Sequence, residues 1–263
     1  MALTKTRQNM TDILLDTTDS IRTITFNRVA RKNAFTEAMY IAFEAALTQA
    51  DQDPGVRVVV VQGHESVFSA GNDIADFLNN PPKNPDAPVF RLLLALATFS
   101  KPLIAAVCGP AVGIGTTMLF HCDLVYAGDN AAFAMPFVNL GLCPEAGASL
   151  LVPQMMGYHR AAELLLLGEP FTAETALEVG LVNRIVPPAG ANALAQAQAR
   201  KLASRPLASV QMTKRLMKQT HAAQVLAQIE AEGQAFSRML SEPAAREAFA
   251  AFLEKRKPDF SAL

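Results

Sequence analysis

The sequence has 263 residues, of which 51% are hydrophobic and 18% are charged, and its formal net charge is −1 at pH 7. A chain of this length and composition can bury a large core, which excludes a disordered protein and predicts a globular one. The near-neutral charge gives no sign of the excess positive charge that binding to nucleic acid or to an anionic membrane surface would need.

The first 63 residues alternate strand and helix signals. Residues 21–27 alternate apolar and polar side chains, which predicts a strand. A helical pattern follows from a cap at Thr36 to residue 53. Residues 56–63 are a β-branched run typical of a strand buried on both faces.

Two more strands are predicted at residues 101–109 and 122–129. The apolar segment 103–120 is long enough to suggest a membrane span, but four Gly and Pro residues interrupt it. A strand, a turn and a helix fit this segment better. The order of the elements therefore predicts an α/β fold with parallel strands.

The composition changes near residue 190 to Ala, Gln, Lys, Arg and Glu, with few glycines and no strand signal. We therefore divide the chain into a core, residues 1–190, and a helical region, residues 191–263. Amphipathic helices are predicted there, broken near Pro206 and Pro243. Two interpretations stay open for this region: a helical cap on the core, or an oligomerisation element.

The three cysteines, Cys108, Cys122 and Cys143, lie in apolar runs, and no His or Cys follows them at a zinc-like spacing. We expect reduced, buried thiols and no metal site. Residues 1–10 lack an apolar signal core, and the last three residues lack the basic middle residue of a peroxisomal signal. These features lead us to expect a soluble, cytoplasmic protein. The Pro- and Asn-rich residues 79–88 are interpreted as a loop or lid.

Two glycine-containing turns are candidate sites of chemistry. Residues 68–73 follow a predicted strand, and residues 109–115 follow another and open a helix. Two unpaired backbone N–H groups that converge on one oxygen would form an oxyanion hole. The alternative is that both segments are only tight turns between a strand and a helix. Neither nucleotide-binding nor nucleophile motifs are present, so acid/base chemistry on a bound carbonyl fits the sequence.

Glu145 lies in a Gly-, Pro- and Ala-containing loop within residues 140–153, with no basic residue near it in sequence. Two interpretations are open. Glu145 is either an exposed residue at a helix N-terminus or a carboxylate held in an apolar pocket, where burial would raise its pKa and make it a better base. A helix that begins nearby would act in the opposite direction.

An ordered set of segments resembles the enoyl-CoA hydratase/isomerase, or crotonase, superfamily. They are "NRVARKNAF" (27–35), "FSAGNDI" (68–74), "KPLIAAVCGPAVGIG" (101–115), "CDLVYAG" (122–128), "FVNLGLCPEAGAS" (137–149), "GEPFTAETALEVGLVNRIV" (168–186) and "FLEKRKPDF" (252–260). The resemblance implies a spiral of ββα repeats, a C-terminal helical trimerisation region and an acyl-CoA ligand. It also implies that the backbone N–H groups of Asn72 and Ile114 hold the thioester oxygen.

The resemblance further implies which residues contact the acyl-CoA thioester. They are Ala30, Arg31, Lys32, Ser69, Ala70, Gly71, Asn72, Asp73, Ile74, Gly113, Ile114 and Phe137. The alternative, non-functional interpretations are that Arg31 and Lys32 lie on a solvated face and that Phe137 packs in the core. Basic residues 255–257, namely Lys255, Arg256 and Lys257, could reach the nucleotide of the same or a neighbouring subunit. No separate cofactor is expected, since coenzyme A belongs to the substrate.

The positions of two glutamates typical of family hydratases hold Thr117 and Phe137 here. Glu145 instead resembles the single catalytic base of peroxisomal-type Δ3,Δ2-enoyl-CoA isomerases. The resemblance thus implies an isomerase that shifts a 3-enoyl-CoA double bond to 2-enoyl-CoA. The alternatives are another crotonase activity, such as enoyl-CoA hydration, and a catalytically silent CoA-binding or RNA-associated member.

The resemblance implies a homotrimer, or a hexamer built as a dimer of trimers. We expect the helices after residue 190 to pack within the trimer, particularly around Phe236, Phe249 and Phe252. Exposing several large aromatic side chains on a monomer would leave an unusually large apolar patch.

Overall fold

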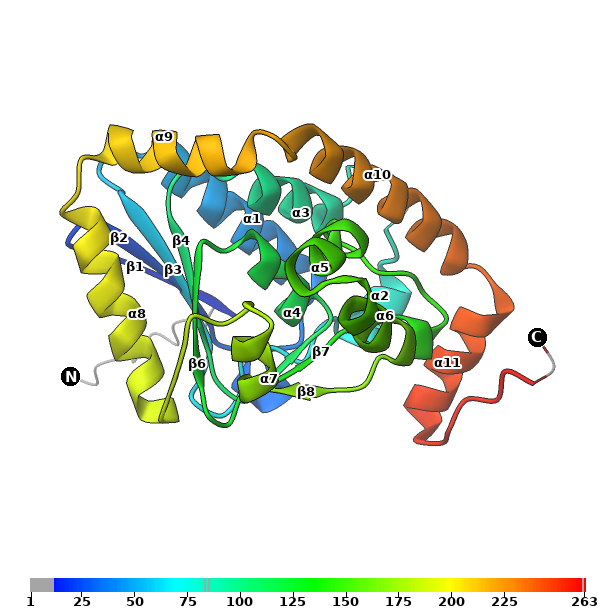
Figure 1. Cartoon of the computed structure of the whole chain (residues 1–263). Coiled ribbons are helices and arrows are strands. Elements are labelled where there is room, and N and C mark those ends of the chain that lie inside the picture. The colour runs from blue at the N-terminus through cyan, green and yellow to red at the C-terminus, as the bar shows by residue number, and fades with distance from the viewer. Residues whose placement is uncertain (1–11, 83, 85, 262) are drawn as a thin grey trace, which may run out of the picture.

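The computed structural model describes residues 12–82, 84, 86–261 and 263. Two sheets and a set of surrounding helices make up the fold (Figure 1). The larger sheet consists of β1 (Ile13–Thr18), β2 (Ile21–Phe26), β3 (Val58–Gln62), β4 (Leu103–Val107), β6 (Leu124–Gly128) and β9 (Arg184–Val186), paired in that order. The strands from β2 to β9 are parallel, which confirms the α/β prediction, while β1 is antiparallel to β2.

Strand β3 is buried on both faces, as its β-branched run predicts. Val58 and Val60 pack toward α8 (Pro188–Ala203), where Ala195 presents a small side chain. Val59 and Val61 belong to the main core on the opposite face. Strands β1 and β2 and the helices around the sheet complete these two apolar layers.

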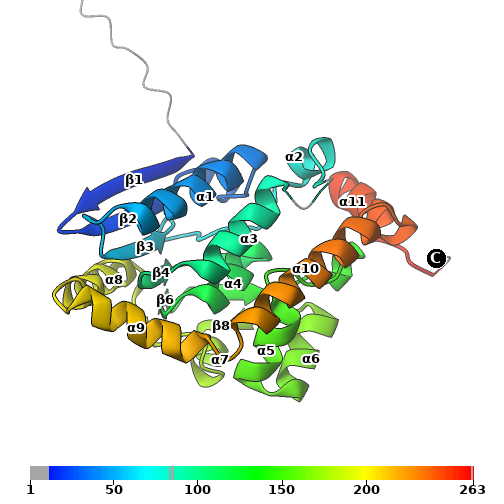
Figure 2. The ribbon, with the colours of Figure 1, turned by 90° about the horizontal axis from the view of Figure 1, so that it is seen from above.

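Helix α1 (Glu37–Gln52) begins where its cap predicts. The Thr36 hydroxyl accepts a hydrogen bond from the Met39 N–H at 3.3 Å, which satisfies one of the free donors of the first turn. Helix α3 (Pro88–Thr98) lies beside α1, and Figure 2 shows α3 between α1 and α10 (Ala222–Met239). These helices cover the face of the sheet opposite α8.

The chain passes from the larger sheet to the smaller one at Gly109. Its φ is +63°, and a Cβ there would lie 2.0 Å from the Ser66 carbonyl oxygen, so only glycine fits. The smaller sheet contains β5 (Pro110–Val112), β7 (Ala132–Ala134) and β8 (Phe171–Thr172), with β8 antiparallel to β7. Helix α4 (Ile114–Thr117) and the 3-10 helix η2 (Met118–His121) follow β5.

The apolar segment 103–120 is therefore strand, strand and short helix, as predicted in outline. In the part of the chain that the structure describes, no helix has the length and apolar character needed to cross a membrane. Residues 1–10, on which the expectation about a signal segment rests, lie outside the described residues. The remaining elements are η1 (Val29–Arg31), α2 (Ile74–Asn79), η3 (Val138–Leu140), α5 (Ala148–Met156), α6 (Tyr158–Leu167) and α7 (Ala173–Glu178).

The C-terminal helices form an arc around the core, from α8 at the left of Figure 1 through α9 (Leu207–Lys218) and α10 along the top to α11 (Pro243–Glu254) at the right. The breaks occur where proline predicts them, since Pro206 precedes α9 and Pro243 opens α11. Helix α8 packs on the larger sheet, and α10 packs on α3 and α5. The boundary at residue 190 stays a prediction.

The structure corrects the expectation for two aromatic residues of this region. Phe236 and Phe249 are 4% and 3% exposed, so they pack inside their own chain. Phe236 contacts Phe77 edge-on, with 6.1 Å between ring centroids. At these two residues the helices fold back on the core, as the cap interpretation of this region expects. Phe252, at 59% exposed, is the one of the three that is open to solvent.

The cysteines are all free thiols, but their burial differs from the expectation. Cys108 is buried, whereas Cys122 and Cys143 are only half-buried. The apolar runs around the latter two end at the edge of the core, where neighbouring residues remain partly accessible.

Candidate active site

The two glycine-containing turns lie against each other. Ser69 and Ala111 form a parallel bridge, in which the Ser69 N–H donates to the Pro110 carbonyl at 3.0 Å and the Val112 N–H donates to the Ser69 carbonyl at 2.9 Å. Gly71 has a φ of +85°, and a Cβ there would lie 2.9 Å from the Val112 carbonyl oxygen. The close approach of the two backbones therefore requires glycine at position 71.

The backbone N–H groups of Asn72 and Ile114 make no hydrogen bond to any described part of the chain. Ile114 is the first residue of α4, and the N–H of a first helical residue has no acceptor within its own helix. Both N–H groups belong to turns that the Ser69–Ala111 bridge holds side by side. That both donors meet one ligand oxygen stays a prediction.

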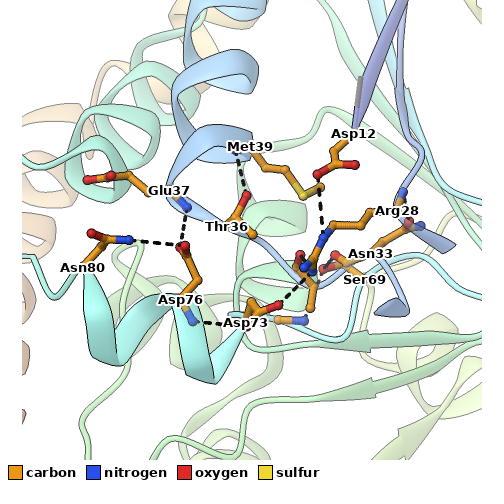
Figure 3. A network of polar contacts seen from close by, with 12 residues as sticks. Asp12, Arg28, Asn33, Thr36, Glu37, Met39, Ser69, Asp73, Asp76 and Asn80 are labelled. Carbon is orange, nitrogen blue, oxygen red and sulfur yellow. Dashed lines mark hydrogen bonds and ion pairs between the residues drawn. The ribbon is translucent and has the colours of Figure 1, made fainter. Parts of the chain in front are cut away.

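A polar network fixes the first of these turns (Figure 3). The Arg28 guanidinium donates to Asp73 Oδ2 at 2.9 Å and lies 3.7 Å from Asp12 Oδ2. Burial would raise the pKa of Asp73, but the N–H of Asp76 and the Arg28 guanidinium hold that pKa below its usual value. Asp73 is thus a charged anchor at the start of α2, where its Oδ1 caps the helix.

Two further side chains tie this turn to the segment before α1. The Asn33 amide donates to the Phe68 carbonyl at 3.0 Å, and the Ser69 hydroxyl donates to the Asn33 carbonyl at 2.9 Å. Both Asn33 and Ser69 are fully buried. The Gly71 N–H donates to Ser69 Oγ at 3.2 Å, so this side chain supports the turn from within.

The expected CoA-contacting residues Ala30, Arg31 and Lys32 are exposed beside the first turn. The Lys32 carbonyl accepts a hydrogen bond from the Ala70 N–H at 2.9 Å, which joins the two segments. Neither Arg31 nor Lys32 takes part in an ion pair with any described residue. Their charges are therefore available at the surface.

Glu145 is buried, with 4% of its surface exposed, so the exposed interpretation is wrong. It precedes two residues in the left-handed conformation, Ala146 at φ +64° and Gly147 at φ +71°, and α5 begins at Ala148. Glu145 Oε1 has no hydrogen-bond partner among the described residues. A buried carboxylate oxygen without a partner is costly and marks a candidate functional group.

Burial raises the pKa of Glu145 to about 8, and the nearby Glu232 carboxylate adds to the rise. The Thr117 hydroxyl opposes this shift, although neither Thr117 Oγ1 nor Glu145 Oε1 has a partner of good hydrogen-bond geometry within the described chain. The free carboxylate at neutral pH is therefore a stronger base than an exposed glutamate.

Tyr40 contacts the turn of Asn72 and lies within the electrostatic influence of Glu145, which sequence pattern alone does not indicate. Its hydroxyl donates to Asn72 Oδ1 at 2.5 Å. Burial raises the pKa of Tyr40, and the Glu145 carboxylate raises it further, which places the phenol in the same electrostatic environment. Helical spacing puts Tyr40 on the apolar face of α1, but spacing alone gives no sign of the polar contact.

The remaining predicted residues lie in different places, and Thr117 is the one among them that lies near Glu145. Thr117 lies next to Glu145, whereas Phe137 is buried in the main core. Arg256 forms ion pairs with Glu247 and Glu254 of its own chain, so its charge is already engaged. Lys255 and Lys257 are exposed, beyond or at the end of α11.

A cavity of about 340 Å³ adjoins this region. Phe35, Tyr40 and Phe77 line it together with carboxylates from Glu37, Asp76 and Asp86. Glu145, Asn72 and Ile114 do not line it, and Tyr40 is the residue that it shares with the site. Within the described residues, no group of three or more His, Cys, Asp or Glu side chains is arranged to hold a metal ion.

The chain is similar to proteins of one known family. The enoyl-CoA hydratase/isomerase family profile matches residues 16–262. The 2,3-dehydroadipyl-CoA hydratase of Escherichia coli K12 is 32% identical over 254 residues, which cover 95% of this chain and 99% of that protein. Enoyl-CoA delta isomerase 2 of Rattus norvegicus is 38% identical over 217 residues, which cover 80% of this chain but only 55% of the rat protein.

A solved structure extends the likeness to the fold. The crystal structure of an enoyl-CoA hydratase/isomerase from Pseudoalteromonas atlantica T6c matches with a TM-score of 0.91 at 36% identity and covers 95% of this chain and 100% of that chain. The crotonase-like architecture with a helical C-terminal region is thereby confirmed. The chain therefore belongs to the enoyl-CoA hydratase/isomerase, or crotonase, family.

Proposed function

We propose that this family member is a Δ3,Δ2-enoyl-CoA isomerase that moves the double bond of a 3-enoyl-CoA thioester to the 2 position. The observation that carries the proposal is Glu145, a buried carboxylate with a pKa near 8 and an unpartnered oxygen. It shares its surroundings with Tyr40, which binds the turn of Asn72, and with Thr117, which belongs to the helix that Ile114 begins.

The reaction needs one base and one oxyanion hole. Glu145 takes a proton from C2, and the C–H electrons form a dienolate whose charge rests largely on the thioester oxygen. The N–H groups of Asn72 and Ile114 stabilise that oxygen, and losing one such donor typically costs roughly 3 kcal/mol. Glu145 then returns the proton to C4, so that the C3–C4 double bond becomes a C2–C3 double bond and no proton is gained or lost.

Burial suits this single-base mechanism. A pKa near 8 leaves part of the Glu145 population ionised at neutral pH and makes the acid form able to hold the proton between the two steps. The apolar surroundings keep water away from the dienolate. In this scheme Tyr40 positions Asn72 by its hydrogen bond to the side chain, while the backbone N–H stays free for the thioester.

Hydration of a 2-enoyl-CoA is the second candidate, because the E. coli relative that matches nearly the whole chain is named a hydratase. Adding water requires a base for the water and an acid for the α-carbon. Thr117 occupies one of the positions where a second carboxylate would be expected. Glu232 is a buried carboxylate nearby, but three donors already occupy its oxygens. The isomerase therefore fits the available groups better.

A turnover screen tests the proposal. Purified protein is given 3-enoyl-CoA and 2-enoyl-CoA substrates while the absorbance of the conjugated enoyl thioester is followed. The proposal requires the absorbance to rise with the 3-enoyl substrate and to fall slowly, if at all, with the 2-enoyl substrate. Fast loss of the 2-enoyl absorbance would instead support the hydratase, and binding without turnover of either would support a silent CoA-binding protein.

We further propose that the exposed Arg31 and Lys32 contact the CoA nucleotide and that the active protein is a homotrimer or a dimer of trimers. Support for the first is that both side chains are exposed next to the turn of Asn72. Support for the second is the exposed Phe252 on α11. A monomeric mass by light scattering at micromolar concentration would contradict the assembly.

A further inference from the structure

Glu232 is a buried carboxylate that comes from a distant helix and binds the loop that carries Glu145. It lies on α10 and is 5% exposed. Its Oε2 accepts a hydrogen bond from the Gly147 N–H at 2.6 Å, and its Oε1 accepts from the N–H and the hydroxyl of Ser149 at 2.8 and 2.5 Å. These donors belong to the entrance of α5, so Glu232 occupies the position of a helix cap supplied from another element.

The segment that Glu232 holds has an unfavourable backbone. Ala146 adopts the left-handed conformation although it carries a side chain, and Gly147 follows in the same region. Two side chains from other elements hold these residues in place: the Glu232 carboxylate at the Gly147 N–H, and His121 Nε2 at the Ala146 carbonyl, 2.7 Å away. The direction of the Glu145 side chain depends on this segment, which directly follows it.

Glu232 is the group near Glu145 that can carry a negative charge at neutral pH, whereas the other polar side chains around Glu145 are neutral. Burial lowers the pKa of His121 to about 4, so that imidazole is neutral at pH 7. Burial raises the pKa of Tyr40 on α1 and raises that of Cys143 to about 11, so both are neutral as well. Thr117 on α4 carries no charge.

The two carboxylates compete for one proton. Burial raises the pKa of Glu232, but the hydroxyl and N–H of Ser149 and the N–H of Gly147 lower it. Only the Thr117 hydroxyl lowers the pKa of Glu145, whereas burial and the negative charge of Glu232 raise it. In a like-charge pair the carboxylate with more hydrogen-bond donors ionises first, so Glu232 ionises before Glu145 as the pH rises.

We infer that Glu232 is a positioning residue for Glu145, which fixes the 145–149 loop through its hydrogen bonds and strengthens Glu145 as a base through its negative charge. This inference rests on the proposed function of Glu145 as the base. It assigns a role in the chemistry to α10, a helix of the C-terminal region.

The pH dependence of turnover separates this role from a purely structural one. Glu232→Gln keeps the shape of the side chain but removes its charge, and Glu230→Gln makes the same change on an exposed residue of the same helix. With Glu232→Gln, kcat on the pH plateau should fall on the order of tenfold because the loop is held less well. The acid limb of the kcat profile should move to lower pH by roughly one pH unit, because the neighbouring charge is gone.

The control Glu230→Gln should leave both the plateau and the limb where they are in the wild type. An acid limb that stays in place in a folded Glu232→Gln variant, whatever happens to the plateau, would overturn the inference. If the Glu145→Gln variant keeps its isomerase activity, the proposed function fails and this inference fails with it. An unmoved limb combined with an inactive Glu145→Gln variant overturns the inference alone.

Infrared titration tests the same assignment without the Glu232 variant. The wild type should show the carbonyl band of a buried protonated carboxyl that disappears as the pH rises through about 8, and Glu145→Gln should lack this band. A band that persists in Glu145→Gln with the same titration would place the proton on Glu232. That result would overturn the inference even if Glu232→Gln failed to fold.

Discussion

The two halves of the candidate site are held in different ways. The turns of Asn72 and Ile114 are joined by backbone hydrogen bonds between Ser69, Pro110 and Val112, and they offer backbone N–H groups. The loop of Glu145 offers a side chain and is held by the side chain of Glu232, which lies 85 residues beyond Gly147 in sequence. The first half presents backbone donors to a ligand, while the second presents one particular side chain. Substitutions should therefore affect the two halves in different ways.

The largest effect is expected for the base itself. Glu145→Gln keeps the shape of the side chain but removes its basicity, so the 3-enoyl to 2-enoyl isomerisation rate should fall by roughly 10²- to 10⁴-fold. CoA-ester binding, measured by calorimetry, should stay close to that of the wild type. Glu230→Gln serves as the surface control. An isomerase rate near that of the wild type would remove Glu145 from the mechanism.

The same substitution should change the pH dependence of stability. In the unfolded chain Glu145 has an ordinary pKa of 4.5, and in the folded protein its pKa is about 8. Between these values the unfolded state releases a proton that the folded state keeps, so the wild type loses stability as the pH rises, at up to roughly 1.4 kcal/mol per pH unit. Below pH 4.5 this cost is absent, and above pH 8 it is complete.

Glu145→Gln should therefore gain stability over the wild type as the pH is raised from 4.5 to 8. Urea unfolding of both proteins at several pH values measures the difference. Parallel stability curves over this range would show that Glu145 has an ordinary pKa in the folded protein. The second half of the site would then not contain a carboxylate with a raised pKa.

The turn of Asn72 should respond to loss of the backbone donor more than to loss of the side chain. Asn72→Pro removes the N–H and should lower turnover on the order of 10²- to 10³-fold, provided that circular dichroism shows an intact fold. Asn72→Ala should keep most of the turnover. It should nevertheless lower the unfolding free energy by about 1–3 kcal/mol, because the buried Tyr40 hydroxyl loses its acceptor. Equal loss of turnover in both variants would mean that the Asn72 side chain takes part in the reaction.

The smallest effect is expected at Ser149, the last residue of the 145–149 loop. Ser149→Ala removes one of three donors to Glu232 and the acceptor of the Gln228 amide, so the unfolding free energy should fall by about 1–2 kcal/mol. Ser241→Ala, on an exposed serine whose hydroxyl donates to the nearby Arg238 carbonyl, is the matched control. Similar unfolding midpoints for the two variants would show that the Ser149 hydroxyl does not help to hold the loop.

Local features of the sequence predict much of the fold. The cap at Thr36, the β-branched run of β3 and the breaks at Pro206 and Pro243 all depend on residues close together in sequence, and the structure confirms each of them. The two glycine-containing turns were also identified correctly as turns, because their glycines meet steric needs that arise within the strand connections. The family resemblance supplied the chemistry expected at these turns.

The character of Glu145 was decided by tertiary structure. Its sequence neighbours allowed both an exposed and a buried carboxylate, and the choice came from packing by residues far away, including Tyr40 and Glu232. The same long-range packing buried Phe236 and Phe249, which the helical pattern alone left open to an interface. Hydrophobic period and turn chemistry act over a few residues, whereas burial and pKa depend on every charge and apolar surface that folding brings near. The sequence by itself therefore determined the elements and the family, and the tertiary fold determined that the Glu145 carboxylate is buried with a raised pKa.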